Sequence, residues 1–525
     1  MEKRQKRLTV IAAGAIFILF AVTRLYRLDS LPEGLHIDEA GAAYDALCLS
    51  QFGVDRYLKS WPVYLINFGG GQNALYTWIC AVLFKIYGGY NIWLYRLVGV
   101  SFHFLTVIFS MKIADRIYRN NVFTVLAVGA ISVICPCLIL MSRFGLESYL
   151  MVGASTVFLY LFLCAVESGK IGYYIGAGVS GGLVLYTYAL SYFILPVFLV
   201  SALCYLLWVK RFQIKGWLAM AIPMGILAFP LILVQVVNLF DLQEMQIGIF
   251  TITKLPIYRS SDLRGISFAS AVNALKSIFI GDSLCYNSIP GIMNLYLITI
   301  PFFIIGFTHM LVIFGKNLHE RQYDGRFISL FWFFCCLILF AMIETNVNRV
   351  NGVFGVVGLI TVEGIWTVLQ KCRGRLKYAV GLCIGIIYLG EFCGFAKYYY
   401  SGEYMADYKP ISYFDITVEE AVAFIDEHPE YQGKGTWMAE QKIYYALSAG
   451  ASPYDMAFAQ GMEETDTGYY YGSLGEIEDG YNYIVRDIFE EYAQDLRNIG
   501  YSEEKYENYS LFYKNWEADL TAGSE

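Results

Sequence analysis

Long runs of apolar residues alternate with short polar segments over the first three quarters of the chain. A membrane-spanning helix needs about 20 mostly apolar residues, with a range of about 17–25. The runs of this length predict eleven spans, at 8–24, 92–111, 122–141, 150–166, 172–189, 192–209, 216–237, 293–314, 327–343, 350–369 and 377–396. We therefore expect an α-helical polytopic membrane protein.

One shorter apolar stretch, residues 74–87, decides the topology. Cytoplasmic loops of membrane proteins carry an excess of Lys and Arg. If this stretch does not span, all the basic clusters fall on the side of the N-terminus, namely those at 3–7, 112–119, 170, 210–215, 316–326 and 371–377. If it spans, every later cluster moves to the opposite side. We therefore predict a cytoplasmic N-terminus and an outer juxtamembrane helix at 74–87.

Charge divides the chain into two predicted domains. Residues 1–396 hold 30 basic and 19 acidic residues, whereas residues 397–525 hold 8 basic and 26 acidic residues. The first part is predicted to be the membrane domain, and the second an acidic, extracytoplasmic α/β domain. "VEEAVAFIDEH" and "RDIFEEYAQDLRNIG" have helical periodicity, and "YENYSLFYKN" is typical of a strand. We expect no nucleic-acid partner.

Unusual polar residues gather in the predicted outer regions. Asp38 and Glu39 follow the first span, with His36 just before them and Asp45 on the same helical face as Asp38. Placing a charged side chain inside a membrane costs free energy, so such a residue usually has a partner. Further charges follow in or beside later spans: Arg96 inside the second span, Arg143 and Glu147 in the short loop "SRFGLESY", and Arg349 in "ETNVNRVNG".

The stretch "NFGGGQNAL" places Gly69, Gly70 and Gly71 just before the predicted juxtamembrane helix. Glycines before a helix expose backbone N–H groups near the positive end of its dipole, which suits a phosphate. We predict Gly70 and Gly71 as phosphate-binding positions.

Together these residues favour sugar transfer from a lipid-linked phosphate donor. Arginines would hold the donor phosphate and stabilise charge on the leaving group, with Arg96, Arg143 and Arg349 as candidates. A carboxylate would take the proton from an acceptor. The sequence has neither a Walker loop nor a Rossmann fingerprint. A divalent metal bridging carboxylate and phosphate is compatible with these residues, but no ligand spacing requires one.

Several of these motifs resemble the GT-C class of membrane glycosyltransferases. They are the first-loop Asp-Glu pair, "PVYLINFGGGQNALY", "LYRL" on the second span and the carboxylate of the second outer loop. The pattern is similar to the protein O-mannosyltransferases and the lipid A aminoarabinose transferases. The resemblance implies Asp38 as catalytic base, Glu147 as a further site carboxylate and Arg96 as a phosphate ligand. We predict that Glu39 supports the site.

The chain also departs from these families. The aminoarabinose transferases follow the acidic pair with "TR", where this chain has "AG", so Arg143 or Arg349 would have to compensate. The protein mannosyltransferases carry a β-trefoil insertion that this sequence lacks, which weakens the case for a protein acceptor.

Structural alternatives remain open for each residue. Asp38 could cap its helix, Arg96 could snorkel, Arg143 could pair with Glu147, and Tyr188 and Tyr192 could belong to an aromatic belt. The predicted function is transfer from a polyprenyl-phosphate sugar to a glycan, lipid or protein acceptor of the cell envelope, outside the plasma membrane. The alternatives are a lipid-linked glycan flippase and a non-catalytic assembly protein.

Overall fold

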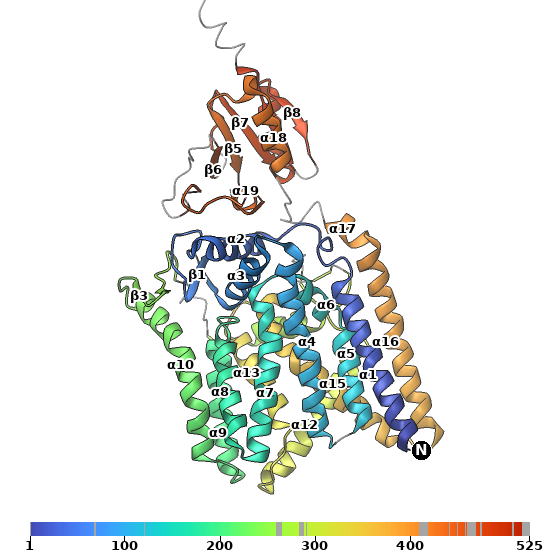
Figure 1. Ribbon diagram of the computed structural model, residues 1–525. Helices are drawn as coiled ribbons and strands as arrows, with labels where there is room; N and C mark the ends of the chain where they lie inside the picture. Colours follow the sequence, from blue (N-terminus) through green and yellow to red (C-terminus); the bar gives the residue numbers. More distant parts are fainter. Residues whose placement is uncertain are drawn as a thin grey trace, which may run out of the picture.

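The structure is a computed structural model in which a bundle of long helices carries smaller elements at one end (Figure 1). It describes residues 2–67, 70–119, 121–258, 265–282, 288–289, 291–408, 418–439, 442–448, 450–456, 458, 469–472, 475–506 and 509–516.

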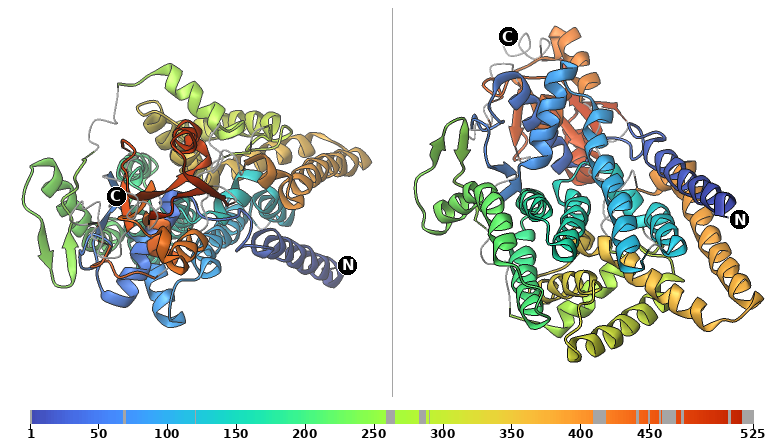
Figure 2. Two further views of the ribbon diagram at one scale, coloured as in Figure 1. Left: turned by 90° about the horizontal axis from the view of Figure 1, so that it is seen from above. Right: turned by 60° about the horizontal axis from the view of Figure 1, so that its bottom comes forward.

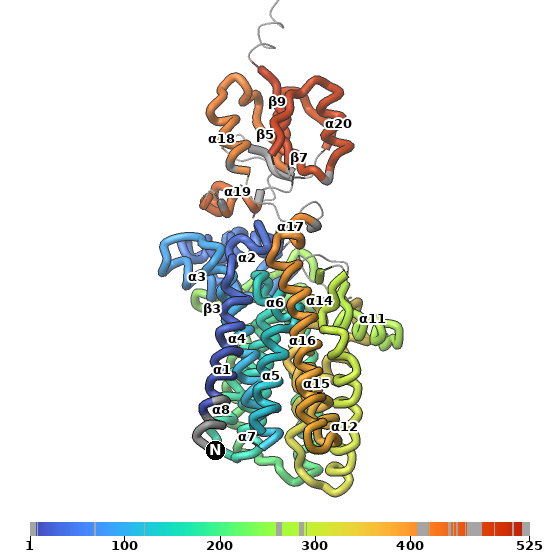
Figure 3. The backbone as a smooth tube through the Cα atoms, turned by 90° about the vertical axis from the view of Figure 1, so that its right-hand side faces the viewer, coloured from blue at the N-terminus to red at the C-terminus, as the bar shows by residue number. Residues whose placement is uncertain are grey.

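Every predicted span corresponds to one or more helices of the bundle. These helices are α1 (Glu2–Leu25), α4 (Ile92–Ile117), α5 (Val122–Ile134), α6 (Pro136–Arg143), α7 (Leu150–Ser168), α8 (Ile171–Leu185), α9 (Ser191–Trp208), α10 (Ile214–Leu239), α12 (Thr299–His319), α13 (Phe327–Phe340), α15 (Phe354–Lys371) and α16 (Arg375–Ser401). Figure 3 shows α16 running along the whole bundle.

Fewer helices than the eleven predicted spans are long enough to cross a membrane. Seven helices of the described chain are long and apolar enough to cross a membrane, or eight if the bent pair α5–α6 is one span. That pair bends by 58° at Pro136, which cannot donate a backbone hydrogen bond. The other three predicted spans are shorter apolar helices, at 9–25, 171–185 and 327–340.

Glycines let two of the long helices pack backbone to backbone. A Cβ atom on Gly306 of α12 would lie 1.9 Å from the carbonyl oxygen of Ile360 on α15. A Cβ atom on Gly364 of α15 would lie equally close, 1.9 Å, to the carbonyl oxygen of Phe302. Small residues at such crossings are typical of helix packing in membranes.

A layer of short elements covers one end of the bundle, which we call the α2 end. It contains α2 (Ile37–Phe52), β1 (Tyr64–Asn67), β2 (Gly70–Asn73), α3 (Leu75–Tyr87), η1 (Glu147–Tyr149), β3 (Met245–Ile247), β4 (Phe250–Ile252), α11 (Phe268–Phe279), α14 (Val347–Val350) and η3 (Asn351–Val353). The predicted helix at 74–87 is present as α3, and it lies beside α2 above the long helices (Figure 1).

The C-terminal unit is built on a five-stranded sheet of order β6-β5-β7-β9-β8. Strand β5 is parallel to β6 and β7, whereas β9 is antiparallel to β7 and β8. The elements are α17 (Glu403–Tyr408), α18 (Glu419–Glu427), η4 (Pro429–Tyr431), β5 (Gly435–Ala439), α19 (Lys442–Ser448), β6 (Tyr469–Gly472), β7 (Tyr481–Arg486), η6 (Asp487–Phe489), α20 (Glu490–Asn498), β8 (Ser502–Lys505) and β9 (Tyr509–Tyr513). The domain boundary predicted at 396/397 lies inside α16, which continues to Ser401.

The C-terminal unit rests on the outward face of α2. The hydroxyl of Tyr44 donates to the carbonyl oxygen of Ala451 at 2.9 Å, and the hydroxyl of Tyr444 donates to that of Leu35 at 3.2 Å. The ring of Phe458 packs 5.9 Å from the Tyr44 ring. Seen from above, the unit lies over only part of the α2 end, and the β3–β4 hairpin and α11 lie outside it (Figure 2).

Candidate active site

The first turn of α2 separates the two acidic residues of the first loop. His36 caps the helix: its Nδ1 accepts from the backbone N–H of Asp38 at 3.2 Å, and Glu39 Oε2 accepts from the His36 N–H at 2.9 Å. Burial lowers the pKa of His36, which keeps the imidazole neutral and Nδ1 able to accept. This reciprocal cap turns Glu39 inward, while the Asp38 side chain remains 38% exposed.

Glu39 and Arg96 form a buried structural pair below Asp38. Glu39 Oε1 accepts from the Gly145 N–H at 2.6 Å and lies 3.7 Å from Arg96 Nε, and both side chains are completely buried. The terminal nitrogens of Arg96 donate to the carbonyl oxygens of Leu28 (3.0 Å), Pro32 (2.8 Å) and Gly34 (2.5 Å). These contacts of Arg96 fix the segment that leads into α2.

Arg143 is also buried and holds the end of α1. Its guanidinium donates to the carbonyl oxygens of Thr23 (3.2 Å), Arg24, Tyr26, Arg27 and Leu31 (each 2.8 Å). Helices commonly use a basic side chain to satisfy their last carbonyl groups. The contacts of Arg143 are thus those of a C-terminal cap.

The β1–β2 hairpin holds Asp38 and Glu147 from one face. Asn67 Nδ2 donates to Asp38 Oδ1 at 2.9 Å, and Gln72 Nε2 donates to Glu147 Oε2 at 2.8 Å. Asn67 stands opposite Gly70, and Leu65 opposite Gln72, so the two amides are diagonal neighbours on the same face. The structure thus brings together two predicted carboxylates that are far apart in the sequence.

Gly70 and Gly71 lie in strand β2, and not at the N-terminus of a helix as the sequence suggested. They pair with Asn67 and Ile66, and α3 begins only at Leu75, so the predicted dipole argument does not apply to them. Gly69 lies outside the described residues. A Cβ atom on Gly71 would lie 2.1 Å from Tyr64 Cε1, so the glycine makes room for the tyrosine ring.

A cavity of about 500 Å³ opens on the other face of the hairpin. Its lining includes Tyr64, Gly71, Tyr188, Tyr192, Gln235, Tyr258 and Arg349. Tyr188 and Tyr192, which sequence patterns assign to an aromatic belt, therefore face a cavity. Aromatic walls with a few convergent polar groups are typical of small-molecule sites.

Arg349 lines this cavity, and the segment that carries it is hydrogen-bonded to the turn that carries Glu147. The guanidinium donates to the carbonyl oxygen of Glu344 at 2.9 Å. Next to it, Asn348 accepts from the hydroxyl of Ser148, and Asn351 Nδ2 donates to the Ser148 carbonyl oxygen at 2.7 Å. Arg349, one of the three predicted phosphate ligands, thus lines a cavity.

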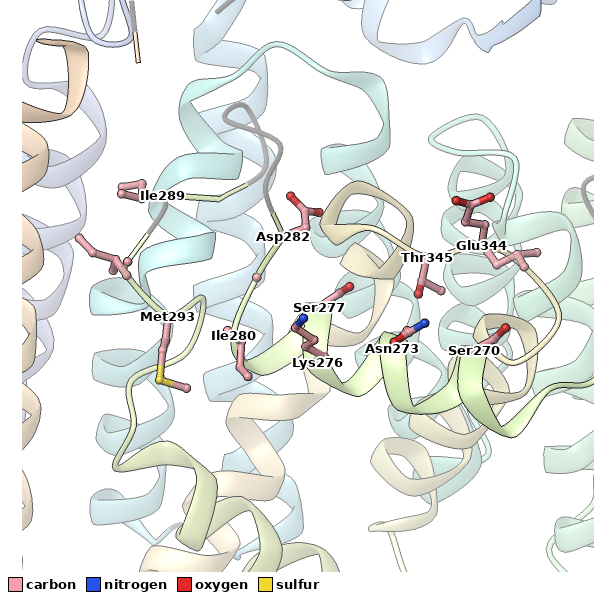
Figure 4. Close-up of a pocket in the computed structure, with 14 residues that line it drawn as sticks. Ser270, Asn273, Lys276, Ser277, Ile280, Asp282, Ile289, Met293, Glu344 and Thr345 are labelled. Atoms are coloured by element: carbon pink, nitrogen blue, oxygen red, sulfur yellow. The ribbon is translucent and has the colours of Figure 1, made fainter. Parts of the chain in front are cut away.

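A second cavity of about 810 Å³ lies beside the first, and the two share Ile343. Figure 4 shows Ser270, Asn273 and Lys276 along α11, with Glu344 on the opposite wall. The lining of this second cavity combines hydroxyl, amide and charged groups with the apolar side chains of Ile280, Ile289 and Met293.

A buried charge cluster lies behind Asp38. Arg56 Nε lies 3.6 Å from Asp45 Oδ1, and both side chains are almost completely buried. Arg56 also donates to Asn67 Oδ1 at 2.6 Å and to the Ile66 carbonyl oxygen at 3.0 Å. The sequence predicted Asp45 on the face of Asp38, but Arg56, Asn67 and Gln72 were not predicted.

Asp55 gives this cluster a pH dependence that can be measured. Its Oδ1 accepts from the N–H groups of Tyr57 (2.9 Å) and Lys59 (2.8 Å), yet burial raises its pKa from 3.8 to about 7. Between pH 3.8 and about pH 7 the folded chain binds more protons than the unfolded chain. The contribution of Asp55 to the free energy of unfolding therefore falls as the pH rises. Asp55→Asn, which keeps the acceptor, should melt several degrees above wild type at pH 8, with the difference fading toward pH 4 in thermal unfolding. A difference that is constant with pH would contradict this.

The described residues contain no group of three or more His, Cys, Asp or Glu side chains that could hold a metal ion.

Comparisons with known proteins give a match in structure alone, since no family model and no curated protein matches the sequence. The ArnT structure from Cupriavidus metallidurans in the apo state aligns with a TM-score of 0.62 at 11% identity, covering 97% of this chain and 98% of that chain. ArnT is a lipid A aminoarabinose transferase of the GT-C class. The chain has the GT-C fold.

Two further GT-C structures contain lipid phosphates. ArnT from Cupriavidus metallidurans bound to undecaprenyl phosphate matches with a TM-score of 0.58 at 10% identity, over 96% of this chain and 97% of that chain. The archaeal oligosaccharyltransferase AglB from Archaeoglobus fulgidus, in complex with an inhibitory peptide and a dolichol-phosphate, matches with a TM-score of 0.51 at 10% identity. This match covers 86% of this chain and 65% of AglB.

Proposed function

We propose that this protein transfers a sugar from a polyprenyl-phosphate donor to a cell-envelope acceptor, at the α2 end of its GT-C fold. One observation carries the proposal. A single hairpin holds Asp38, whose side chain is 38% exposed, and Glu147 on one face. Its other face borders a cavity that Arg349 also lines. The bound lipid phosphates of the ArnT and AglB structures support a donor of this kind.

Asp38 serves as the general base in this proposal. The acceptor oxygen or nitrogen forms a bond to the anomeric carbon of the sugar, and its proton moves to the Asp38 carboxylate. The bond between the anomeric carbon and the phosphate oxygen breaks, and the phosphate keeps the electron pair. Glu147, held by Gln72, orients the groups that enter between the two carboxylates.

Arg349 is the proposed partner of the donor phosphate. Arg349 lines the cavity, and a guanidinium matches the charge that develops on the leaving phosphate. Arg96, Arg143 and Glu39 contribute indirectly, because they fix the segment from Thr23 to Gly34 on which α2 begins. Gly71 of β2 leaves room for the Tyr64 ring, which lines the cavity.

In this proposal the α2 end and the C-terminal unit face the outside of the plasma membrane, and the N-terminus lies in the cytoplasm. The positions of the basic clusters support this orientation, since Lys and Arg are enriched in cytoplasmic loops. The lipid tail of the donor would then enter from the bilayer and the acceptor from the aqueous side.

Purified membranes containing the protein, supplied with radiolabelled polyprenyl-phosphate sugars, test this function. We expect label to move from the lipid fraction into a lipid-free or acceptor fraction, and unlabelled undecaprenyl phosphate to inhibit the reaction. Arg349→Met should raise the KM for the donor, while Arg373→Met, at an exposed position, serves as control. Translocation of the labelled lipid without transfer would instead identify a flippase.

A further inference from the structure

Asn67 connects the proposed base to the buried charge cluster. Its Nδ2 donates to Asp38 Oδ1 at 2.9 Å, and its Oδ1 accepts from Arg56 at 2.6 Å. Arg56 in turn lies 3.6 Å from Asp45, to whose Oδ1 its own backbone N–H donates at 3.1 Å. A continuous chain therefore runs from Asp45 through Arg56 and Asn67 to Asp38.

The chemistry of Arg56 fixes which way the Asn67 amide points. A guanidinium has only donors, so the amide must present its oxygen to Arg56 and its NH₂ group to Asp38. The reverse orientation would place two donors against each other and two acceptors against each other. Asn67 is thereby held as a permanent donor to one oxygen of Asp38, which leaves the other oxygen for an incoming proton.

Gly41 leaves room on α2 for the contact between Arg56 and Asn67. A Cβ atom on Gly41, one turn after Asp38, would lie 2.5 Å from an Arg56 nitrogen and 2.9 Å from Asn67 Oδ1. Arg56 is buried, and its charge is compensated by buried Asp45. The network is thus packed against the bare backbone of α2, where side-chain freedom is low.

We propose that Asn67 is the positioning residue for Asp38 and that buried Arg56 sets its orientation. The inference rests on the proposed function, because it assigns the partner of the proposed base. Among the described residues, the charged and titratable groups around this contact include His36, Glu147, Arg56, Asp45, Asp55 and Tyr57. Of these, His36 lies 3.6 Å from Asp38 Oδ2.

Two substitutions distinguish a role of Asn67 in orienting Asp38 from a role in accepting a hydrogen bond from Arg56. Asn67→Ala removes both contacts, whereas Asn67→Asp keeps an acceptor for Arg56 but loses the donor and places a second carboxylate beside Asp38. A hydrogen bond to a charged group is worth about 1.5–3 kcal/mol, so we expect Asn67→Ala to lower kcat about tenfold or more. Asn67→Asp should lower kcat further at pH 8, with partial recovery at lower pH and an unchanged KM for the donor.

The exchanged pair Asp38→Asn with Asn67→Asp tests the contact without activity. Asn67→Asp alone should lower the melting temperature through like-charge repulsion, and adding Asp38→Asn should restore it because the amide and carboxylate have changed places. Transfer should stay lost in the exchanged pair. Additive melting effects, or wild-type kcat in Asn67→Asp, would overturn the inference. Wild type that is inactive with every donor would refute the proposed function, while the melting data still decide the contact.

Discussion

Replacing Asp38 with asparagine is expected to abolish most sugar transfer while the protein remains folded. General base catalysis contributes about 10²- to 10⁴-fold to rates, so we expect kcat to fall by that factor. The side chain of asparagine has the same shape, and its oxygen can still accept from Asn67. The helix cap depends on His36 and Glu39, which are unchanged. Initial rates of transfer with a labelled polyprenyl-phosphate sugar measure the effect.

Asp29→Asn is the matched control for this substitution. Asp29 is an exposed acid of the same loop, so the same change of charge there should leave transfer unaffected. Melting temperatures of both variants should stay close to wild type. Equal rates for Asp38→Asn and wild type would show that another group takes the proton.

Arg143→Leu is expected to have the largest effect on folding. The substitution removes the guanidinium donors from the carbonyl groups of buried Arg24 and Leu31, whereas the Thr23 carbonyl keeps the hydroxyl of Tyr400 and the Arg27 carbonyl keeps the Leu31 N–H. Each buried polar group that is left without its hydrogen-bond partner typically costs about 1–3 kcal/mol. We therefore expect little monodisperse protein after detergent extraction, and a strongly lowered melting temperature for the fraction that is recovered.

Arg143→Lys distinguishes charge from geometry in this cap. Lysine keeps the charge but has three donors on one nitrogen, which cannot reach carbonyls spread over Thr23 to Leu31. It should therefore recover only part of the stability. Arg373→Leu, at an exposed position, should behave like wild type. Near-normal stability in Arg143→Leu would mean that Arg143 is available for another role, including the phosphate contact predicted from the sequence.

The helices of the bundle could be predicted because apolar runs of spanning length leave few alternatives. The same pattern correctly placed a helix at 74–87. It did not predict the 58° bend at Pro136 or the short length of α8 and α13, because hydropathy does not record where a helix breaks. Pairing of β1 with β2 was also missed, since glycine-rich segments carry no alternating pattern.

Charge alone could not separate site residues from buried supports. Arg96 and Arg143 have the same appearance in the sequence as Arg349, yet they are surrounded by carbonyl groups of the loop that precedes α2. The path of that loop is set by tertiary contacts, so the sequence pattern does not reveal these partners. Asn67, Gln72 and Arg56 are single polar residues with no motif, and only their position next to Asp38 and Glu147 makes them informative.

The position of the C-terminal unit on α2 has a consequence for how the protein is made. Synthesis proceeds from the N-terminus, so α2 emerges long before the segment around Tyr444 that covers it. Until the last part of the chain folds, the outward face of α2, with Tyr44, stays open to water. A polypeptide truncated before this unit would expose this face of α2, so the face is covered only after the segment around Tyr444 has been synthesised and folded.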